Sequence, residues 1–337
     1  MRHSRDDTLA VLHGQRIGRL LVFSGLPCLT ATGLRAAGVC YGEAHTDAAK
    51  MAAAAASTFE MYAFESAVVP FDLCVEAEAL GCEIDFQSDV DGWLAPVVSA
   101  PLERELRIAY RVSQMAVDGG RASVVADALR LLKQMVGREI VIGACVPGPF
   151  TLAWQLFGAE AWLSSLDDQS EAETVLAQTA DFLARVATQY HAAGADFITV
   201  HEMGGSPQVI GPNVFRKLVK PALQNLFARL PSPNVLSICG DTNVVVADMA
   251  ACGASALSVD HRNDLARTRR LLGDDVVLFG NFDPVATLSN GTPADITRAV
   301  GAIADAGANA VWPGCDLWPE IPDENMRALL MTANVQR

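Results

Sequence analysis

Cysteine, histidine and carboxylate side chains, which can bind metal ions, occur where short apolar segments of this 337-residue chain end. Cys239 and Cys315 each lie next to a glycine at such an end, and His201 and His261 occupy equivalent places. Two thiolates with an imidazole and a carboxylate suit tetrahedral zinc. These residues therefore predict a zinc site, although for each cysteine a small apolar core residue is the alternative.

The apolar segments that must position these side chains have four to six residues, and most are rich in β-branched residues. Such segments are typical of strands that are buried on both faces. They cover residues 20–24, 67–70, 140–145, 197–201, 235–239, 256–260, 276–280 and 310–313. Amphipathic segments lie between them, and helices are predicted over 48–62, 213–230 and 292–306.

Eight buried strands that alternate with helices predict a (β/α)8 barrel. The alternative is a doubly wound open sheet. Residues 81–121 do not follow the alternation, because they are polar, strand-like and rich in turn residues, so an insertion after the second strand is expected. Without a fixed-period repeat or a clear linker, the chain is predicted to form a single domain over residues 1–337.

The active site of such a barrel lies at the carboxyl ends of its strands. Polar residues at the predicted strand ends are therefore candidates for binding or catalysis. In chain order they are Asp72, His201, Glu202, Asp241, Asp260, Asn281 and Asp283. For Asp72, as for the nearby Glu76 and Glu78, a solvated charge at the rim of the barrel is the alternative interpretation.

Acidic residues outnumber basic ones by 39 to 25, which gives a formal charge of -14. A field of that sign repels phosphate groups, so neither nucleic acid nor an anionic membrane surface is an expected partner. The first residues lack the apolar stretch of a secretory signal, and no apolar run is long enough to span a bilayer. Eight scattered cysteines favour free thiols over disulfides, and a cytoplasmic protein is predicted.

Six short segments, distributed over nearly the whole chain, resemble the uroporphyrinogen decarboxylase superfamily. Within it they resemble the corrinoid-dependent branch, the methylcobamide:coenzyme M methyltransferases. The segments are 43–47 (Glu-Ala-His-Thr-Asp), 70–81 (Pro-Phe-Asp-Leu-Cys-Val-Glu-Ala-Glu-Ala-Leu-Gly), 147–152 (Pro-Gly-Pro-Phe-Thr-Leu), 237–242 (Ser-Ile-Cys-Gly-Asp-Thr), 280–284 (Gly-Asn-Phe-Asp-Pro) and 313–315 (Pro-Gly-Cys).

The resemblance implies a (β/α)8 barrel with one zinc ion, held through a His-x-Cys…Cys pattern, that binds the thiol of a methyl acceptor. It also implies that the barrel mouth docks a methyl-corrinoid protein, with methylcobalamin as donor or acceptor. Cys239 and Cys315 match the two thiolate ligands, and Asp260 lies where an acidic ligand often occurs. Glu202 and Asp260 are then the predicted catalytic residues, and Asn281 is predicted to bind substrate.

The chain departs from the implied pattern at Ser237, which stands where the pattern has histidine. His261, next to Asp260, is the predicted replacement ligand, and His201 is the second choice. The predicted acceptor is a small thiol such as coenzyme M, or tetrahydrofolate. The alternatives are a uroporphyrinogen decarboxylase and a non-catalytic corrinoid- or substrate-binding relative. The decarboxylase is disfavoured because residues 18–30 contain a single arginine, Arg19.

Overall fold

The computed structural model describes residues 4–87, 92–102, 112 and 115–335. Eight parallel strands form one sheet in the order β1-β10-β9-β8-β7-β6-β5-β2. The strands are β1 (Leu21–Val22), β2 (Ser66–Val69), β5 (Val141–Pro147), β6 (Phe197–His201), β7 (Asn234–Ile238), β8 (Ala256–Val259), β9 (Val277–Gly280) and β10 (Ala310–Val311). Each lies at a position predicted for a strand.

The two end strands of this sheet, β1 and β2, meet and close the barrel. The backbone N–H of Glu65 donates to the carbonyl of Val22 at 3.1 Å. The Ser66 hydroxyl accepts from the backbone N–H of Ser24 at 3.0 Å and donates to its carbonyl at 2.7 Å. The predicted (β/α)8 barrel is therefore confirmed.

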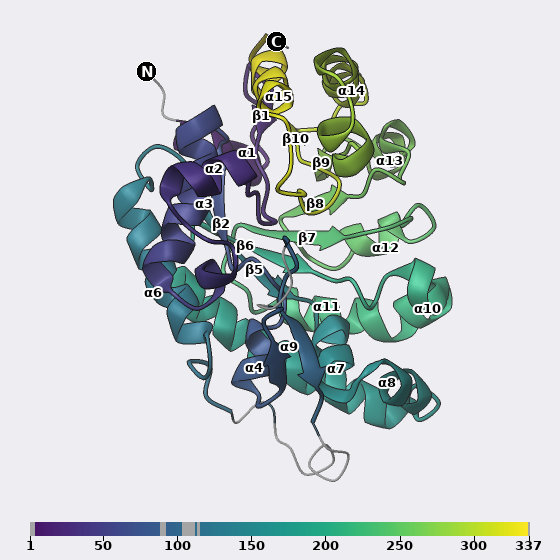
Figure 1. Cartoon of the computed structure of the whole chain (residues 1–337). Helices are drawn as coiled ribbons and strands as arrows, with labels where there is room; N and C mark the ends of the chain where they lie inside the picture. Colours follow the sequence, from purple (N-terminus) through teal and green to yellow (C-terminus); the bar gives the residue numbers. More distant parts are fainter. Residues whose placement is uncertain (1–3, 88–91, 103–111, 113–114, 336–337) are drawn as a thin grey trace.

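Helices surround the strands as a ring (Figure 1). They are α2 (Ala31–Ala37), η1 (Gly42–His45), α3 (Ala48–Tyr62), α4 (Val75–Ala79), α6 (Ala122–Met135), α7 (Pro149–Phe157), α8 (Ala159–Ser165), α9 (Gln169–Ala193), α10 (Pro207–Val214), η3 (Phe215–Val219), α11 (Lys220–Phe227), α12 (Val246–Ala250), α13 (Leu265–Leu272), η4 (Pro284–Ser289), α14 (Pro293–Asp305) and α15 (Asp323–Val335). In the parts of the chain that the structure describes, none of them is both long and apolar enough to cross a bilayer.

Two of the predicted helices form as expected. The helix predicted over 48–62 is α3, and the one predicted over 292–306 is α14, which begins with a capping box between Thr292 and Asp295. The segment 213–230 is not one regular helix, because the π-helical turn η3 separates α10 from α11. Pro221 lacks the N–H that the carbonyl of Lys217 would need, so an uninterrupted α-helix cannot form there.

Aromatic side chains fill the interior of the barrel. Phe23 lies 5.1 Å from Phe279 between ring centroids, and Phe279 stacks on Trp312 at 5.4 Å. Val11 and Leu12 of α1 (Ser4–Leu12) belong to the same buried cluster. Because α1 packs against the amino ends of the strands, that end is closed, and polar groups collect at the opposite, carboxyl end.

The expected insertion after the second strand contains an antiparallel pair, β3 (Glu83–Asp85) and β4 (Val97–Ala100). This pair confirms the strand-like pattern in the residues that are described. Residues 88–91, 103–111 and 113–114 of the predicted insertion lie outside the described part of the chain. Trp93 lies between β3 and β4, is half-buried and packs against the main core.

Candidate metal centre

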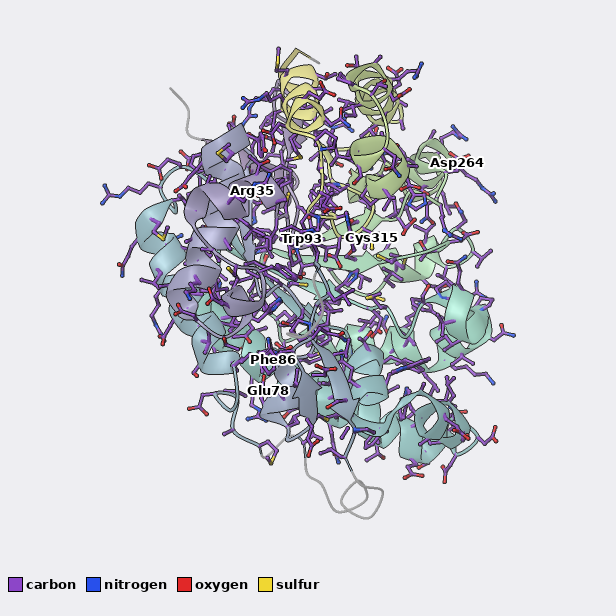
Figure 2. The ribbon with its side chains drawn as sticks, in the orientation of Figure 1. Arg35, Glu78, Phe86, Trp93, Asp264 and Cys315 are labelled. Carbon is purple, nitrogen blue, oxygen red and sulfur yellow. The ribbon has the colours of Figure 1, made fainter. Side chains whose placement is uncertain are left out.

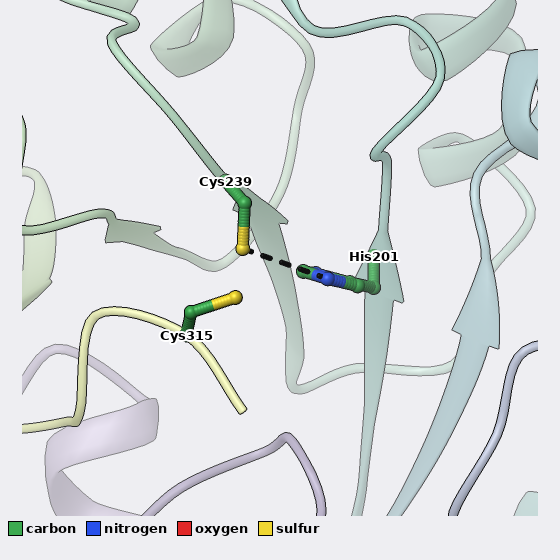
Figure 3. Close-up of side chains that lie close together, drawn as sticks. All are labelled: His201, Cys239 and Cys315. Carbon is green, nitrogen blue, oxygen red and sulfur yellow. Dashed lines mark hydrogen bonds between the residues drawn. The ribbon is translucent and has the colours of Figure 1, made fainter. Parts of the chain in front are cut away.

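Three potential metal ligands converge at the carboxyl ends of the strands (Figure 3). His201 is the last residue of β6, Cys239 follows β7, and Cys315 lies in the loop after β10. Their ligand atoms lie within 4.8 Å of one another, and Nε2 of His201 is 3.7 Å from Sγ of Cys239. Tetrahedral zinc, with Zn–S near 2.3 Å and Zn–N near 2.0 Å, separates such atoms by about 3.6 Å. The spacing therefore fits zinc.

The register of the sheet explains why His201 reaches the sulfurs. In the parallel pair of β6 and β7, His201 is the partner of Ser237. Paired residues on neighbouring strands present their side chains on the same side of a sheet. Ser237 is small and 2% exposed, so it leaves space beside the imidazole. The serine that departs from the His-x-Cys pattern thus lies beside a histidine from the adjacent strand.

The electrostatic environment favours the neutral forms of His201 and Cys239. Burial lowers the pKa of His201, and the negative charge of Asp316 only partly offsets this effect. The neighbouring Cys315 thiol, burial and the charges of Asp316 and Asp260 raise the pKa of the Cys239 thiol well above its usual value. A neutral imidazole has a free lone pair, and a bound divalent cation deprotonates thiol ligands, so the donors suit a metal ion.

His261, the predicted imidazole ligand, lies in a different group of side chains. Its Nδ1 is 3.0 Å from Oδ1 of Asp260, and its Nε2 is 3.4 Å from Oδ2 of Asp283. Oδ2 of Asp260 also accepts a hydrogen bond of 2.9 Å from the backbone N–H of Gly240. Among the described residues, the metal-ligand group that includes both sulfurs contains His201 and not His261.

The carboxylate of Glu202 connects the first turn of α7 to the loop after β6. It accepts hydrogen bonds from the backbone N–H groups of Phe150, Thr151 and Gly205 at 3.0, 2.9 and 3.0 Å, and from the Thr151 hydroxyl. Glu202 is fully buried. Its oxygens are thus occupied by the first turn of α7 and the loop that follows β6.

Asn281 and Asp241 also form hydrogen bonds with other residues of the chain. The amide nitrogen of Asn281 donates to the carbonyls of Asp260 and Asn263, both at 2.9 Å, and so supports the loop after β8. Asp241 is exposed, and its carboxylate accepts hydrogen bonds from the backbone and side chain of Asn243 at 3.0 and 2.7 Å.

Asp72 belongs to a buried ionic cluster and not to the group that contains the sulfurs. Arg121 binds both of its oxygens, at 2.7 and 3.1 Å, and Nδ1 of His45 is 3.0 Å from Oδ2. Burial alone would raise the pKa of Asp72, but its bonds to His45 and Arg121 lower it to about 2. Nε of Arg121 also donates to Oε2 of Glu78 at 2.6 Å, and the guanidinium carbon lies 5.0 Å from the ring centroid of Phe86. Figure 2 labels Glu78 and Phe86. Sequence reasoning missed Arg121, because no motif links it to Asp72.

Asp316 is a second residue that sequence reasoning missed. It directly follows Cys315, so its position at the end of the eighth strand was a usable signal. Its side chain is exposed, and no described residue forms a hydrogen bond or ion pair with it. Desolvation raises the pKa of Asp316, and a positive charge on His201 would oppose this effect.

Comparison with known proteins agrees with this geometry. A model of the family described as uroporphyrinogen decarboxylase (URO-D) matches residues 3–335. The chain belongs to the uroporphyrinogen decarboxylase family. It is 32% identical over 321 residues to the methylcobamide:CoM methyltransferase MtbA of Methanosarcina mazei, covering 92% of each chain. It is 31% identical over 329 residues to the methylcobamide:CoM methyltransferase MtaA of Methanosarcina barkeri, covering 96% of this chain and 95% of the relative.

A solved structure of a methyltransferase from Methanosarcina mazei matches this family member with a TM-score of 0.91 and 28% identity. The match covers 99% of this chain and 98% of that chain. These findings confirm the predicted resemblance and the prediction that the chain is an enzyme.

One buried carboxyl group of this uroporphyrinogen decarboxylase family member predicts a pH effect on stability. Oε1 of Glu76 accepts a hydrogen bond of 3.3 Å from the Tyr190 hydroxyl, and Oε2 has no partner among the described residues. Burial and, less strongly, the charge of Asp72 raise the pKa of Glu76 to about 8. The hydrogen bond from Tyr190 and the charge of Arg121 lower this pKa, but by less. The folded chain therefore holds this proton up to about pH 8, whereas the unfolded chain releases it near pH ~4.3.

Stability should therefore fall as the pH rises through this interval, because the folded state binds more protons than the unfolded state. Replacing Glu76 with glutamine removes the ionisation. We expect the free energy of unfolding of Glu76→Gln, relative to the unmodified chain, to increase by roughly 3 kcal/mol between pH 5 and pH 8. Urea denaturation at several pH values measures it, with the exposed Glu60→Gln as control. A difference that is constant with pH would contradict the prediction.

Proposed function

We propose that this chain is a zinc-dependent methyltransferase that moves a methyl group between a corrinoid and the sulfur of a small thiol. The observation that carries the proposal is the convergence of two thiols and one imidazole at a spacing that suits tetrahedral zinc. The names of the relatives, methylcobamide:CoM methyltransferases, support a corrinoid as methyl donor and a thiol as acceptor. A methyl-corrinoid protein is the proposed partner, and tetrahydrofolate is the other acceptor considered.

In this proposal Cys239, Cys315 and His201 hold the zinc ion. Three protein ligands leave the fourth position of a tetrahedral site free for substrate, as in catalytic zinc sites. Bound zinc would supply the ability to hold a substrate thiol in its nucleophilic thiolate form. The ring of His201 is 1% exposed, so the protein excludes water from that side of the site and fixes the direction of its lone pair.

The remaining candidates take supporting roles. We assign Glu202, Asp260 and Asn281 to positioning. Asp260 binds the backbone next to Cys239, Glu202 adjoins His201 and binds the start of α7, and Asn281 supports the loop that carries Asp260. Asp72 is assigned to the ionic cluster with Arg121. Asp241 and Asp283 remain proposed substrate contacts at the rim.

The test of this ligand set is the metal content of two histidine variants. We expect His201→Gln to lose most of about one equivalent of zinc, because a single neutral ligand is removed from a three-ligand site. His261→Gln should keep its zinc, since that ring lies between two aspartates instead. Elemental analysis of purified protein measures both, and circular dichroism confirms that each variant is folded. Zinc loss in His261→Gln with retention in His201→Gln would reverse the assignment, and a metal-free parent chain would favour a non-catalytic relative.

A further inference from the structure

The two cysteines of the proposed zinc site lie close enough to react with each other. Their sulfur atoms belong to the group whose ligand atoms lie within 4.8 Å of one another, and Figure 3 shows them side by side. Both are free thiols in this structure. A disulfide holds its two sulfurs at about 2.05 Å, so Sγ of Cys239 and Sγ of Cys315 would have to approach by no more than about 3 Å.

Rotation of the two side chains supplies an approach of this size. Turning the Cα–Cβ bond of a cysteine from one staggered rotamer to the next moves its Sγ by about 3 Å. Cys239 follows the last residue of β7, and Cys315 lies in the loop between β10 and α15, so neither belongs to a strand or a helix. The sulfurs can therefore meet without breaking the pairing of the sheet.

A small reagent has access to this pair of thiols. Cys239 and Cys315 are half-buried, whereas five of the other cysteines are buried, namely Cys28, Cys74, Cys82, Cys145 and Cys252. A cysteine that is oxidised next to a second thiol is converted to a disulfide, because the neighbour reacts with it before further oxidant does. The spacing of the pair thus favours a disulfide over separate oxidation of each sulfur.

We propose that Cys239 and Cys315 form a reversible disulfide when hydrogen peroxide reaches the site. One sulfur attacks a peroxide oxygen, the O–O bond breaks, and a sulfenic acid and a water molecule result. The second sulfur then attacks the sulfenic sulfur, the S–O bond breaks, and another water leaves as the S–S bond forms. The two thiols lose two electrons, the peroxide is reduced to two waters, and both thiol protons end in that water.

The disulfide and the proposed metal centre exclude each other. Zinc binds cysteine as thiolate, and a disulfide sulfur carries no such charge, so His201 alone would remain as a ligand. In the zinc-loaded chain the two protons of the reaction come from solvent, because both cysteines are already deprotonated. The release of zinc rests on the proposed function, whereas formation of the disulfide depends only on the spacing of the two thiols.

Peroxide treatment of the full-length protein tests the inference. We expect about two equivalents of hydrogen peroxide to remove about two of the eight free thiols and to lower the mass of the chain by about 2 Da. Peptide mapping by mass spectrometry should find one link, between the peptides that contain Cys239 and Cys315. A chromogenic chelator should detect the release of about one equivalent of zinc, in step with the loss of thiols. Dithiothreitol should restore both thiols and zinc binding.

Two cysteine variants separate this pair from the other thiols. Cys315→Ser lacks one of the two sulfurs, so its yield of intramolecular disulfide should fall at least about tenfold. Cys40→Ser removes an exposed cysteine outside the metal-ligand group and should form the disulfide to the same extent as the unmodified chain. Circular dichroism confirms that each variant is folded, and a non-reducing gel shows that the link lies within one chain.

Absence of the link, separate oxidation of the two sulfurs, or a link between other cysteines would overturn the inference. Each of these results would leave the proposed function intact if the untreated chain contained about one equivalent of zinc. An untreated chain without zinc would instead contradict the proposed function, and the peptide map of that metal-free chain would still decide whether the disulfide forms.

Discussion

Replacing Cys239 with serine is expected to lower the zinc content of the purified protein from about one equivalent to less than about a tenth, and to abolish methyl transfer to a thiol. A serine hydroxyl stays protonated at neutral pH and is a poor ligand, so the site would retain only Cys315 and His201. The spacing of these atoms, within 4.8 Å, otherwise allows one ion to bind all three. Elemental analysis and an assay with methylcobalamin plus thiol measure the two effects.

Cys40→Ser is the matched control, because Cys40 is an exposed free cysteine outside this group. It should keep both its zinc and its activity. If Cys239→Ser retained a full equivalent of zinc, the metal would be bound elsewhere, and the proposed centre would be wrong.

Replacing Arg121 with methionine is expected to lower the free energy of unfolding by about 3–5 kcal/mol at pH 7, because it leaves a buried carboxylate without its main partner. Arg121 is 4% exposed and binds both oxygens of Asp72, whose side chain is 1% exposed. His45 would remain as the one described side chain beside that charge. Urea denaturation measures the loss.

Arg130→Met is the control for this change. Arg130 pairs with Asp127 on the exposed face of α6, and more than half of each side chain is exposed. Exposed pairs contribute little, so the loss should stay below about 1 kcal/mol. In the double variant Asp72→Asn, Arg121→Met the stability should partly recover, because no charge is left buried. A loss in Arg121→Met no larger than in Arg130→Met would show that the cluster is not important for stability.

The order of elements could be predicted from the sequence because each strand and helix carries its own local pattern. The apolar segment 197–201 coincides with β6, and the segment 48–62 coincides with α3. The approach of Cys239 to Cys315, 76 positions apart, also followed from the pattern. In a parallel barrel every strand ends at the same rim, so residues at strand ends are neighbours whatever their separation in the chain.

The identity of the imidazole beside the sulfurs depended on the tertiary structure. His201 ends the apolar segment 197–201 and His261 follows the segment 256–260, and the local sequence does not show which of the two rings faces the sulfurs. The register of β6 against β7 places His201 opposite Ser237, whereas Asp260 and Asp283 surround His261. Side-chain direction at a strand end is set by register and loop contacts, which involve residues distant in the chain.

The buried ionic cluster of Asp72 and Arg121 likewise could not be predicted from the sequence. Asp72 follows the second strand and its partner Arg121 lies 49 positions later, at the end of an insertion without a repeating pattern. The local sequence was sufficient to predict which segments are strands and helices and which end of the barrel is polar, because these properties depend on local periodicity. Only the packed chain decided which charges pair and which, like Asp316, stay unpaired, because ion pairing depends on distances that arise after the elements assemble.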